Sequence, residues 1–284
     1  CTARLLPAGN LLEKLAIRLV PDAKRREETS ELDARLLATP ALALGQARNV
    51  AGEMAACAVR ALENALTSLT GYTPELARSI REDEERCDHY EDIIGTYLVQ
   101  LSSHSLSDSE SQESTELLKT IGDFERISDH AVNVLESAEE LRVKELTFSR
   151  AAQSELDVLS RAVREILTLA LRAFREKDAA AAGQVEPLEQ VIDALKEQMR
   201  TRHILRMQQG QCSIEAGFVW CDLLTDLERT SDHCSNIAGC VIDAAQHNLN
   251  LHETLHNMHH SDEEYRRRFD ACAEIYRLPP PEQA

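Results

Sequence analysis

Pairs of carboxylates one helical turn apart recur four times in this sequence. They are Glu84 with Asp88, Glu125 with Asp129, Glu189 with Asp193, and Glu228 with Asp232. Residues at i and i+4 of an α-helix lie on the same face, so each pair presents its oxygen ligands side by side. Carboxylate oxygens suit magnesium, calcium, manganese or iron ions and also admit zinc. The pattern therefore indicates metal-binding chemistry.

The four pairs fall into two sets that keep a common register. Glu228 follows Glu125 by 103 residues, and Glu189 follows Glu84 by 105. Polar neighbours keep the same register, with Asp123, Arg126, His130 and Asn133 matched by Asp226, Arg229, His233 and Asn236. Near-equal offsets at this many polar positions are what an internal duplication produces. The sequence therefore predicts two similar halves, each with two acidic pairs.

The two pairs of one half converge if the helices that carry them are neighbours. The first cluster is then Glu84, Asp88, Glu125 and Asp129, and the second is Glu189, Asp193, Glu228 and Asp232. Four carboxylates at the edge of a helix contact cannot all stay ionised without compensation. A divalent or trivalent ion would compensate them, with iron, zinc, manganese, magnesium and calcium all open. Asn133 and Asn236 are possible additional ligands.

The same acidic pairs also have a plainer interpretation. Acids at i and i+4 decorate the solvated faces of many helices and pair there with arginine, and Arg126 and Arg229 are available for that role. His130 and His233 directly follow the motif aspartates, which turns them about 100° away on a helix. We therefore expect these histidines to support the acids or to pack beside them, and not to bind metal.

The spacing of apolar residues predicts the elements that position these acids. Apolar residues recur every three or four positions over about 41–71, 74–101, 107–141, 149–176, 178–207 and 213–247, which indicates six long helices. Gly and Pro number only 10 and 8 among 284 residues, and valine, isoleucine and aromatic residues are sparse, which disfavours sheets. Thr73 with Pro74 marks one helix start, and Ser107 with Glu110 has the spacing of a capping box.

The predicted fold class is all-α, with two tandem three-helix bundles packed side by side. The first bundle covers 41–144 and the second 145–247. Residues 1–40 form a leader, in which we expect 32–40 to be extended or irregular and to be closed by Pro40. Residues 248–284 form a polar, His-rich tail.

Charge and composition exclude several classes of function. A formal net charge of -18 repels nucleic acid, so we expect no nucleic-acid partner. Neither a Walker loop nor a dinucleotide-binding glycine pattern occurs. The eight cysteines contain no Cys-x-x-Cys pair and are typical of reduced core residues. We found no run of 18 or more apolar residues in the sequence.

Two phrases resemble the signature of the PhoU family, which reads like LERIGDHAVNIAE. They are FERISDHAVNVLE, which begins at Phe124, and LERTSDHCSNIAG, which begins at Leu227. The resemblance covers roughly residues 41–247 and implies two three-helix bundles whose two acidic clusters bind metal. The chain departs from the family phrase at Ser128, and at Thr230 with Ser231, where the family has Ile-Gly.

The flanks resemble a longer protein of the same kind. The leader segments LLEKLAIRLVPD and LDARLLATPALALGQAR and the tail SDEEYRRRFDACAEIYRLPP resemble those around the C-terminal PhoU-like domain of bacterial sodium/phosphate cotransporters. The resemblance implies a regulatory domain without catalytic residues at the cytoplasmic face of the inner membrane. Its expected partners are the membrane transport domain of the same polypeptide and a second copy in a homodimer. The abrupt start, without an initiator Met, fits a fragment.

Two other functions remain open. One is a free-standing PhoU-type regulator of phosphate uptake and signalling. The other is a metal-dependent hydrolase, because the stretch from His252 through Glu253, Thr254 and Leu255 to His256 matches His-Glu-x-x-His. The hydrolase would lose turnover on Glu253→Gln and keep it on Glu125→Gln. The histidines of the tail could also bind zinc at the surface.

Overall fold

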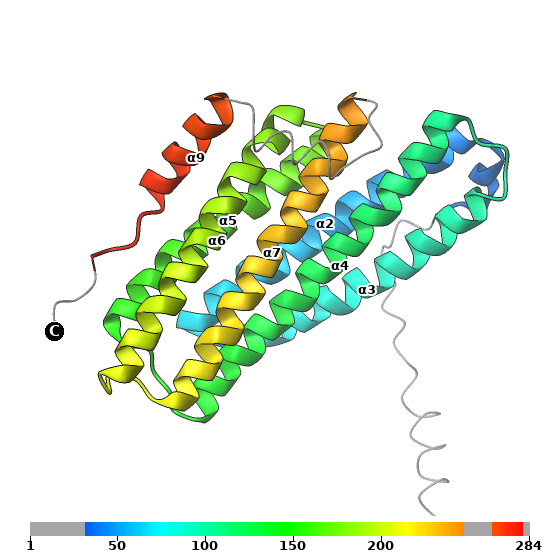
Figure 1. Ribbon diagram of the computed structural model, residues 1–284. Coiled ribbons are helices and arrows are strands. Elements are labelled where there is room, and N and C mark those ends of the chain that lie inside the picture. Colours follow the sequence, from blue (N-terminus) through cyan, green and yellow to red (C-terminus); the bar gives the residue numbers. More distant parts are fainter. Residues whose placement is uncertain (1–31, 247–262, 281–284) are drawn as a thin grey trace, which may run out of the picture. The chain divides into compact units, whose positions relative to one another are not determined.

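All long elements in the described part of the chain are helices (Figure 1). The computed structural model describes residues 32–246 and 263–280. Its elements are η1 (Ala34–Ala38), α2 (Pro40–Gly71), α3 (Pro74–Leu101), α4 (Asp108–Val143), α5 (Arg150–Glu176), α6 (Ala179–Gln208), α7 (Ile214–Gln246) and α9 (Glu263–Ile275). No strand occurs within these described ranges, so the all-α prediction is confirmed, and α2 to α7 are the six predicted helices.

Local chemistry fixes the helix ends where the sequence places them. The Thr73 side chain accepts a hydrogen bond from the Leu76 amide, and Pro74 opens α3. Ser107 and Glu110 form the predicted capping box at the start of α4. Asp178 begins α6 by accepting from two backbone amides of its first turn. Each cap satisfies donors that a helix start leaves unpaired.

The prediction that 32–40 is extended or irregular was wrong for its central part. Ala34–Ala38 form the 3-10 helix η1, and the Asp33 carboxylate caps it by accepting from the Arg35 amide. Leu37 is buried against the core. The Tyr97 hydroxyl of α3 donates to the Asp33 carbonyl at 3.1 Å. These tertiary contacts order a segment whose local sequence carries no helical period.

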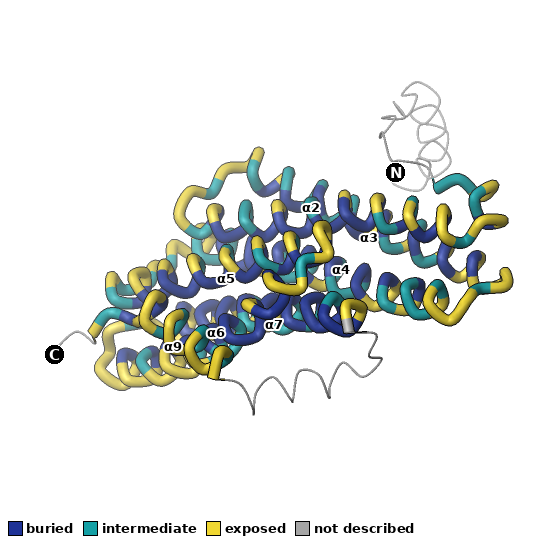
Figure 2. The backbone as a smooth tube through the Cα atoms, turned by 90° about the horizontal axis from the view of Figure 1, so that it is seen from above, coloured by how far each residue is buried: buried dark blue, intermediate teal, exposed yellow. Residues whose placement is uncertain are grey.

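The helices pack in two sets of three that share one core. Helices α2, α3 and α4 contact one another, as do α5, α6 and α7. The sets meet mainly where α4 runs beside α7, with a smaller contact of α2 with α5 (Figure 1). Phe124 of α4 and Phe174 of α5 pack edge to face, 5.2 Å between ring centres. The buried residues form a continuous cluster across both sets, and buried stripes follow the inward faces of the helices (Figure 2).

A proline inside α6 creates the docking point for α9. Pro187 is buried and lies within the helix, and because it lacks an N–H it leaves the Gly183 carbonyl without its usual helical partner. Arg268 of α9 donates to that carbonyl at 2.6 Å. The sequence interpretation missed α9, which is only 13 residues long, is mostly polar and has no fully buried residue. The His252–His256 stretch lies outside the described residues.

None of the described helices combines the length and the apolarity needed to cross a bilayer.

Candidate functional site

The first acidic cluster lies between two helices that pack together, as predicted. Glu84 and Asp88 are on α3, and Glu125 and Asp129 are on α4. Burial raises the pKa of Glu84, with further contributions from Asp129 and Asp88. Burial, then Asp129, raises the pKa of Glu125 to about 6. The structure therefore brings acids of both helices close enough to repel one another.

An arginine at the surface partly balances this first cluster. Arg126 lies 3.0 Å from Asp129 and 3.4 Å from Glu125, and its side chain is 61% exposed. One of the acidic pairs is thus paired with arginine at the surface, as the plainer interpretation expects. An exposed ion pair of this kind contributes little stability, about 0–1 kcal/mol.

The second cluster repeats the arrangement on α6 and α7, with deeper burial. Burial raises the pKa of Glu189 to about 8, and the carboxylates of Glu186, Asp232 and Asp193 add to the shift. Burial and then Glu228 raise the pKa of Asp232. Like charges again face one another across a helix contact.

A lysine that the sequence interpretation missed sits in the second cluster. The Lys196 ammonium lies 2.7 Å from a Glu228 oxygen, and the two side chains are only 18% and 17% exposed. Lys196 is three residues after Asp193 on α6, one turn along the acidic face. Extending the alignment of the two halves by one turn beyond Asp193 would have found it.

The donor types of both clusters suit a hard metal ion, but the side chains are not arranged around a common point. Within residues 32–246 and 263–280, no three His, Cys, Asp or Glu side chains form a group that could hold a metal ion as they stand. Metal binding therefore needs side-chain rotation from the positions seen here. Burial and mutual repulsion raise the pKa values of these carboxylates, so the attraction of a bound cation would favour that rotation.

The two halves are joined by reciprocal polar contacts across α4 and α7. His130 Nδ1 lies 2.9 Å from Asp226 Oδ1, to which the Asn133 amide donates at 3.0 Å. In the mirror arrangement, His233 Nδ1 lies 2.9 Å from Asp123 Oδ1, and the Asn236 amide donates to the same oxygen at 3.2 Å. The two imidazole rings lie 5.7 Å apart. Each histidine and the asparagine three residues after it thus bind the same aspartate of the other half.

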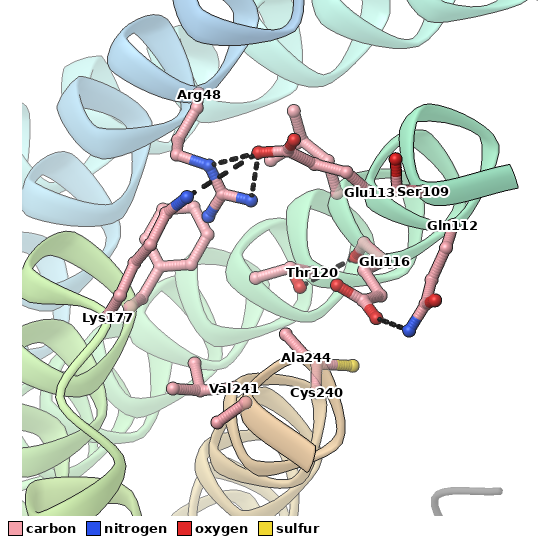
Figure 3. Close-up of a pocket in the computed structure, with 13 residues that line it drawn as sticks. Arg48, Ser109, Gln112, Glu113, Glu116, Thr120, Lys177, Cys240, Val241 and Ala244 are labelled. Atoms are coloured by element: carbon pink, nitrogen blue, oxygen red, sulfur yellow. Dashed lines mark hydrogen bonds and ion pairs between the residues drawn. The ribbon is translucent and has the colours of Figure 1, made fainter. Parts of the chain in front are cut away.

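A cavity between the two halves is lined by residues outside the acidic clusters (Figure 3). It has a volume of about 320 Å³ and lies between the first turns of α4 and the last turns of α7. Arg48 of α2 donates to Glu113 of α4 at 2.7 Å, and Lys177 lies 3.7 Å from the same carboxylate. None of the eight predicted ligands lines it. No sequence motif marked this cavity, because its wall comes from four separate helices.

Both halves of the chain match one known protein family. The PhoU domain family matches residues 51–138 and, separately, 156–241. Each match contains one complete acidic cluster. The chain belongs to the PhoU family. The double match confirms the internal duplication that the two registers predict.

Several PhoU proteins are similar to the chain in sequence. It is 26% identical to the "Phosphate-specific transport system accessory protein PhoU homolog 1" of Thermotoga maritima over 182 residues, which cover 64% of the chain and 78% of that protein. It is 23% identical to the "Phosphate-specific transport system accessory protein PhoU homolog" of Borreliella burgdorferi over 192 residues, covering 65% of the chain and 85% of that protein.

Solved PhoU structures share the fold. PhoU from Pseudomonas aeruginosa superposes with a TM-score of 0.59 at 24% identity, covering 75% of this chain and 97% of that one. The phosphate transport system regulatory protein PhoU from Streptococcus pneumoniae gives a TM-score of 0.65 at 18% identity, covering 74% and 99%. The helical-bundle fold predicted from the PhoU resemblance is therefore confirmed.

The departures from the PhoU phrase are accommodated inside the helices. The hydroxyls of Ser128 and Ser231 donate to the carbonyls of Glu125 and Glu228, at 2.8 and 2.7 Å. Thr230 donates in the same way to the carbonyl of residue 226 at 2.8 Å. These buried hydroxyls are satisfied by the preceding turn, so they do not compete for the carboxylates.

Proposed function

We propose that this chain is a regulatory domain that modulates phosphate transport and has no catalytic role of its own. The observation that carries the proposal is that both halves match the PhoU domain and keep their acidic pairs in register on adjacent helices. Relatives named as accessory proteins of the phosphate-specific transport system support the same function.

The partner in this proposal is the membrane transport domain of a sodium-dependent phosphate cotransporter within the same polypeptide. The leader and the tail support it by their resemblance to such transporters. The domain then lies at the cytoplasmic face of the membrane, where a homodimer would double the surface available to the transport domain. The alternative is a free-standing regulator of the same PhoU type.

Metal ions are part of the proposed mechanism. Each cluster joins two helices, α3 with α4 or α6 with α7, through carboxylates that repel one another. A hard cation between them would replace repulsion by attraction and fix the angle of the two helices. The contacts at Asp123 and Asp226 link the two halves. A change in one cluster is thereby transmitted to the surface of the other half.

Uptake of radiolabelled phosphate in the host tests the regulatory function. Cells that lack residues 41–247 should lose the adjustment of uptake to external phosphate. Cells with Glu125→Gln/Asp129→Asn should lose part of that adjustment at normal protein level. Unchanged uptake in the deletion strain contradicts a regulatory role.

An immunoblot of fractionated host cells separates the fused from the free form. An antibody against the helical domain should detect a polypeptide well above 31.8 kDa in the membrane fraction. A band of about that mass in the soluble fraction would select the free-standing regulator instead. Light scattering of the purified chain then measures whether it forms the proposed dimer.

A further inference from the structure

The two acidic clusters differ at one matched position. Lys196 on α6 follows Glu91 on α3 by 105 residues, the offset that also relates Glu189 to Glu84. The duplication therefore places a lysine in one half where the other half has a glutamate. This exchange reverses the charge at the same point of the two clusters.

The surroundings of this position show the consequence. In the first cluster Glu91 is a further carboxylate that raises the pKa of Glu125. In the second cluster Lys196 lies 2.7 Å from Glu228, the counterpart of Glu125. The first cluster thus gathers five carboxylates against the exposed Arg126. The second already contains a cation that is more than four-fifths buried.

The second cluster is also covered by the C-terminal helix. Tyr265 of α9 is close enough to Glu186 and Glu189 for both carboxylates to raise its pKa, after burial, to about 12. Arg268 of α9 binds the Gly183 carbonyl one turn before Pro187. A metal ion in this cluster would meet the Lys196 ammonium. Among the described helices, α9 packs mainly on α6, which carries the second cluster and not the first.

We propose that Lys196 is the internal cation of the second cluster, so that the chain takes a hard metal ion at the first cluster alone. The inference rests on the proposed metal binding and restricts it to one of the two clusters. The second cluster then holds its helices together whether or not metal is present. The metal occupancy of the first cluster changes with the concentration of the ion.

Manganese titration of the 284-residue protein tests this assignment. The protein is stripped with a chelator, and bound Mn²⁺ is measured by equilibrium dialysis with electron paramagnetic resonance of the free ion. Wild type should bind one ion per chain, Lys196→Met should bind two, and Glu91→Lys should bind none. The exchange Glu91→Lys/Lys196→Met should bind one ion, at the second cluster.

Matched variants make each result decisive. Lys196→Gln keeps a polar side chain and should also gain a second ion, and circular dichroism checks that each variant folds. Two ions in wild type, unchanged by Lys196→Met, overturn the inference and leave the metal proposal standing. No ion in wild type and one in Lys196→Met upholds the role of Lys196 and refutes metal at the first cluster. No ion in any variant refutes both.

Discussion

His130 of α4 and Asp226 of α7 face each other across the contact between the two halves, 2.9 Å apart and each 14% exposed. His233 and Asp123 form the mirror pair at the same distance. The same side chains thus serve both halves in exchanged positions, as expected for a duplicated domain that packs against itself around a local two-fold axis. The polar contacts therefore specify how the halves are aligned.

Removing an aspartate at this contact should destabilise the fold. Asp226→Ala leaves both His130 and Asn133 without their acceptor, at a cost of about 1–3 kcal/mol. Asp123→Ala should cost a similar amount. Asp222→Ala, an exposed acid one turn earlier on α7, should change stability by less than about 0.5 kcal/mol. Urea unfolding measures all three, and equal effects at Asp222 and Asp226 would contradict the role given to the contact.

Arg268 should contribute to stability mainly because Pro187 removes the backbone hydrogen bond to the Gly183 carbonyl. Arg268→Met leaves the Gly183 carbonyl unpaired and should cost about 1–3 kcal/mol. In a Pro187→Ala background the residue 187 amide can bond that carbonyl, so the same substitution should cost clearly less. A double-mutant cycle by thermal unfolding gives the coupling. Additive effects would show that the arginine acts independently of the proline.

The buried ion pair between α5 and α6 should respond differently to single and double substitution. Glu155 is 1% exposed and accepts from both terminal nitrogens of Arg206 at 2.9 Å. Arg206→Met removes both of these bonds, leaves the carboxylate only its 3.2 Å contact with Arg202, and should cost about 1–3 kcal/mol. Glu155→Leu/Arg206→Met should recover most of this, because the buried carboxylate goes with its partner and Arg202 keeps its bond to the Pro279 carbonyl. Chemical denaturation compares the two, and a double variant as unstable as the single one would refute the argument.

The acidic clusters should make the metal-free protein less stable at high pH. The pKa of Glu189 is raised from 4.5 to about 8, so the folded protein keeps this proton where the unfolded chain has lost it. Its contribution to stability is full below pH 4.5 and is lost as pH rises towards 8. The pKa of Glu125 is about 6, so its contribution to stability is lost as pH rises from 4.5 through 6.

Two variants assign these pH windows in the presence of a chelator. Glu189→Gln should flatten the fall in unfolding free energy between pH 6 and 8 by up to about 1.4 kcal/mol per pH unit. Glu125→Gln should alter the profile below about pH 7 and leave the interval above it unchanged. A profile of Glu189→Gln that parallels wild type above pH 6 would be inconsistent with the raised pKa.

Much of the fold follows from short-range rules that the sequence displays. The apolar period, the capping box at Ser107 and the proline at residue 74 place the helices, and the common register reveals the duplication. The same register predicted which acids would face one another. What it missed depends on contacts between distant segments. The role of Lys196 needs α6 beside α7, and α9 needs a carbonyl freed by a proline 81 residues before Arg268.

The measurement that tests the central claim most directly is the metal content of the purified protein by elemental mass spectrometry. Wild type is compared with Glu125→Gln/Asp129→Asn and with the matched Glu228→Gln/Asp232→Asn. We predict that the first double variant loses the metal of wild type and that the second retains it. Metal that persists in both variants, or none in wild type, would contradict the assignment of the first acidic cluster as the site of a metal ion.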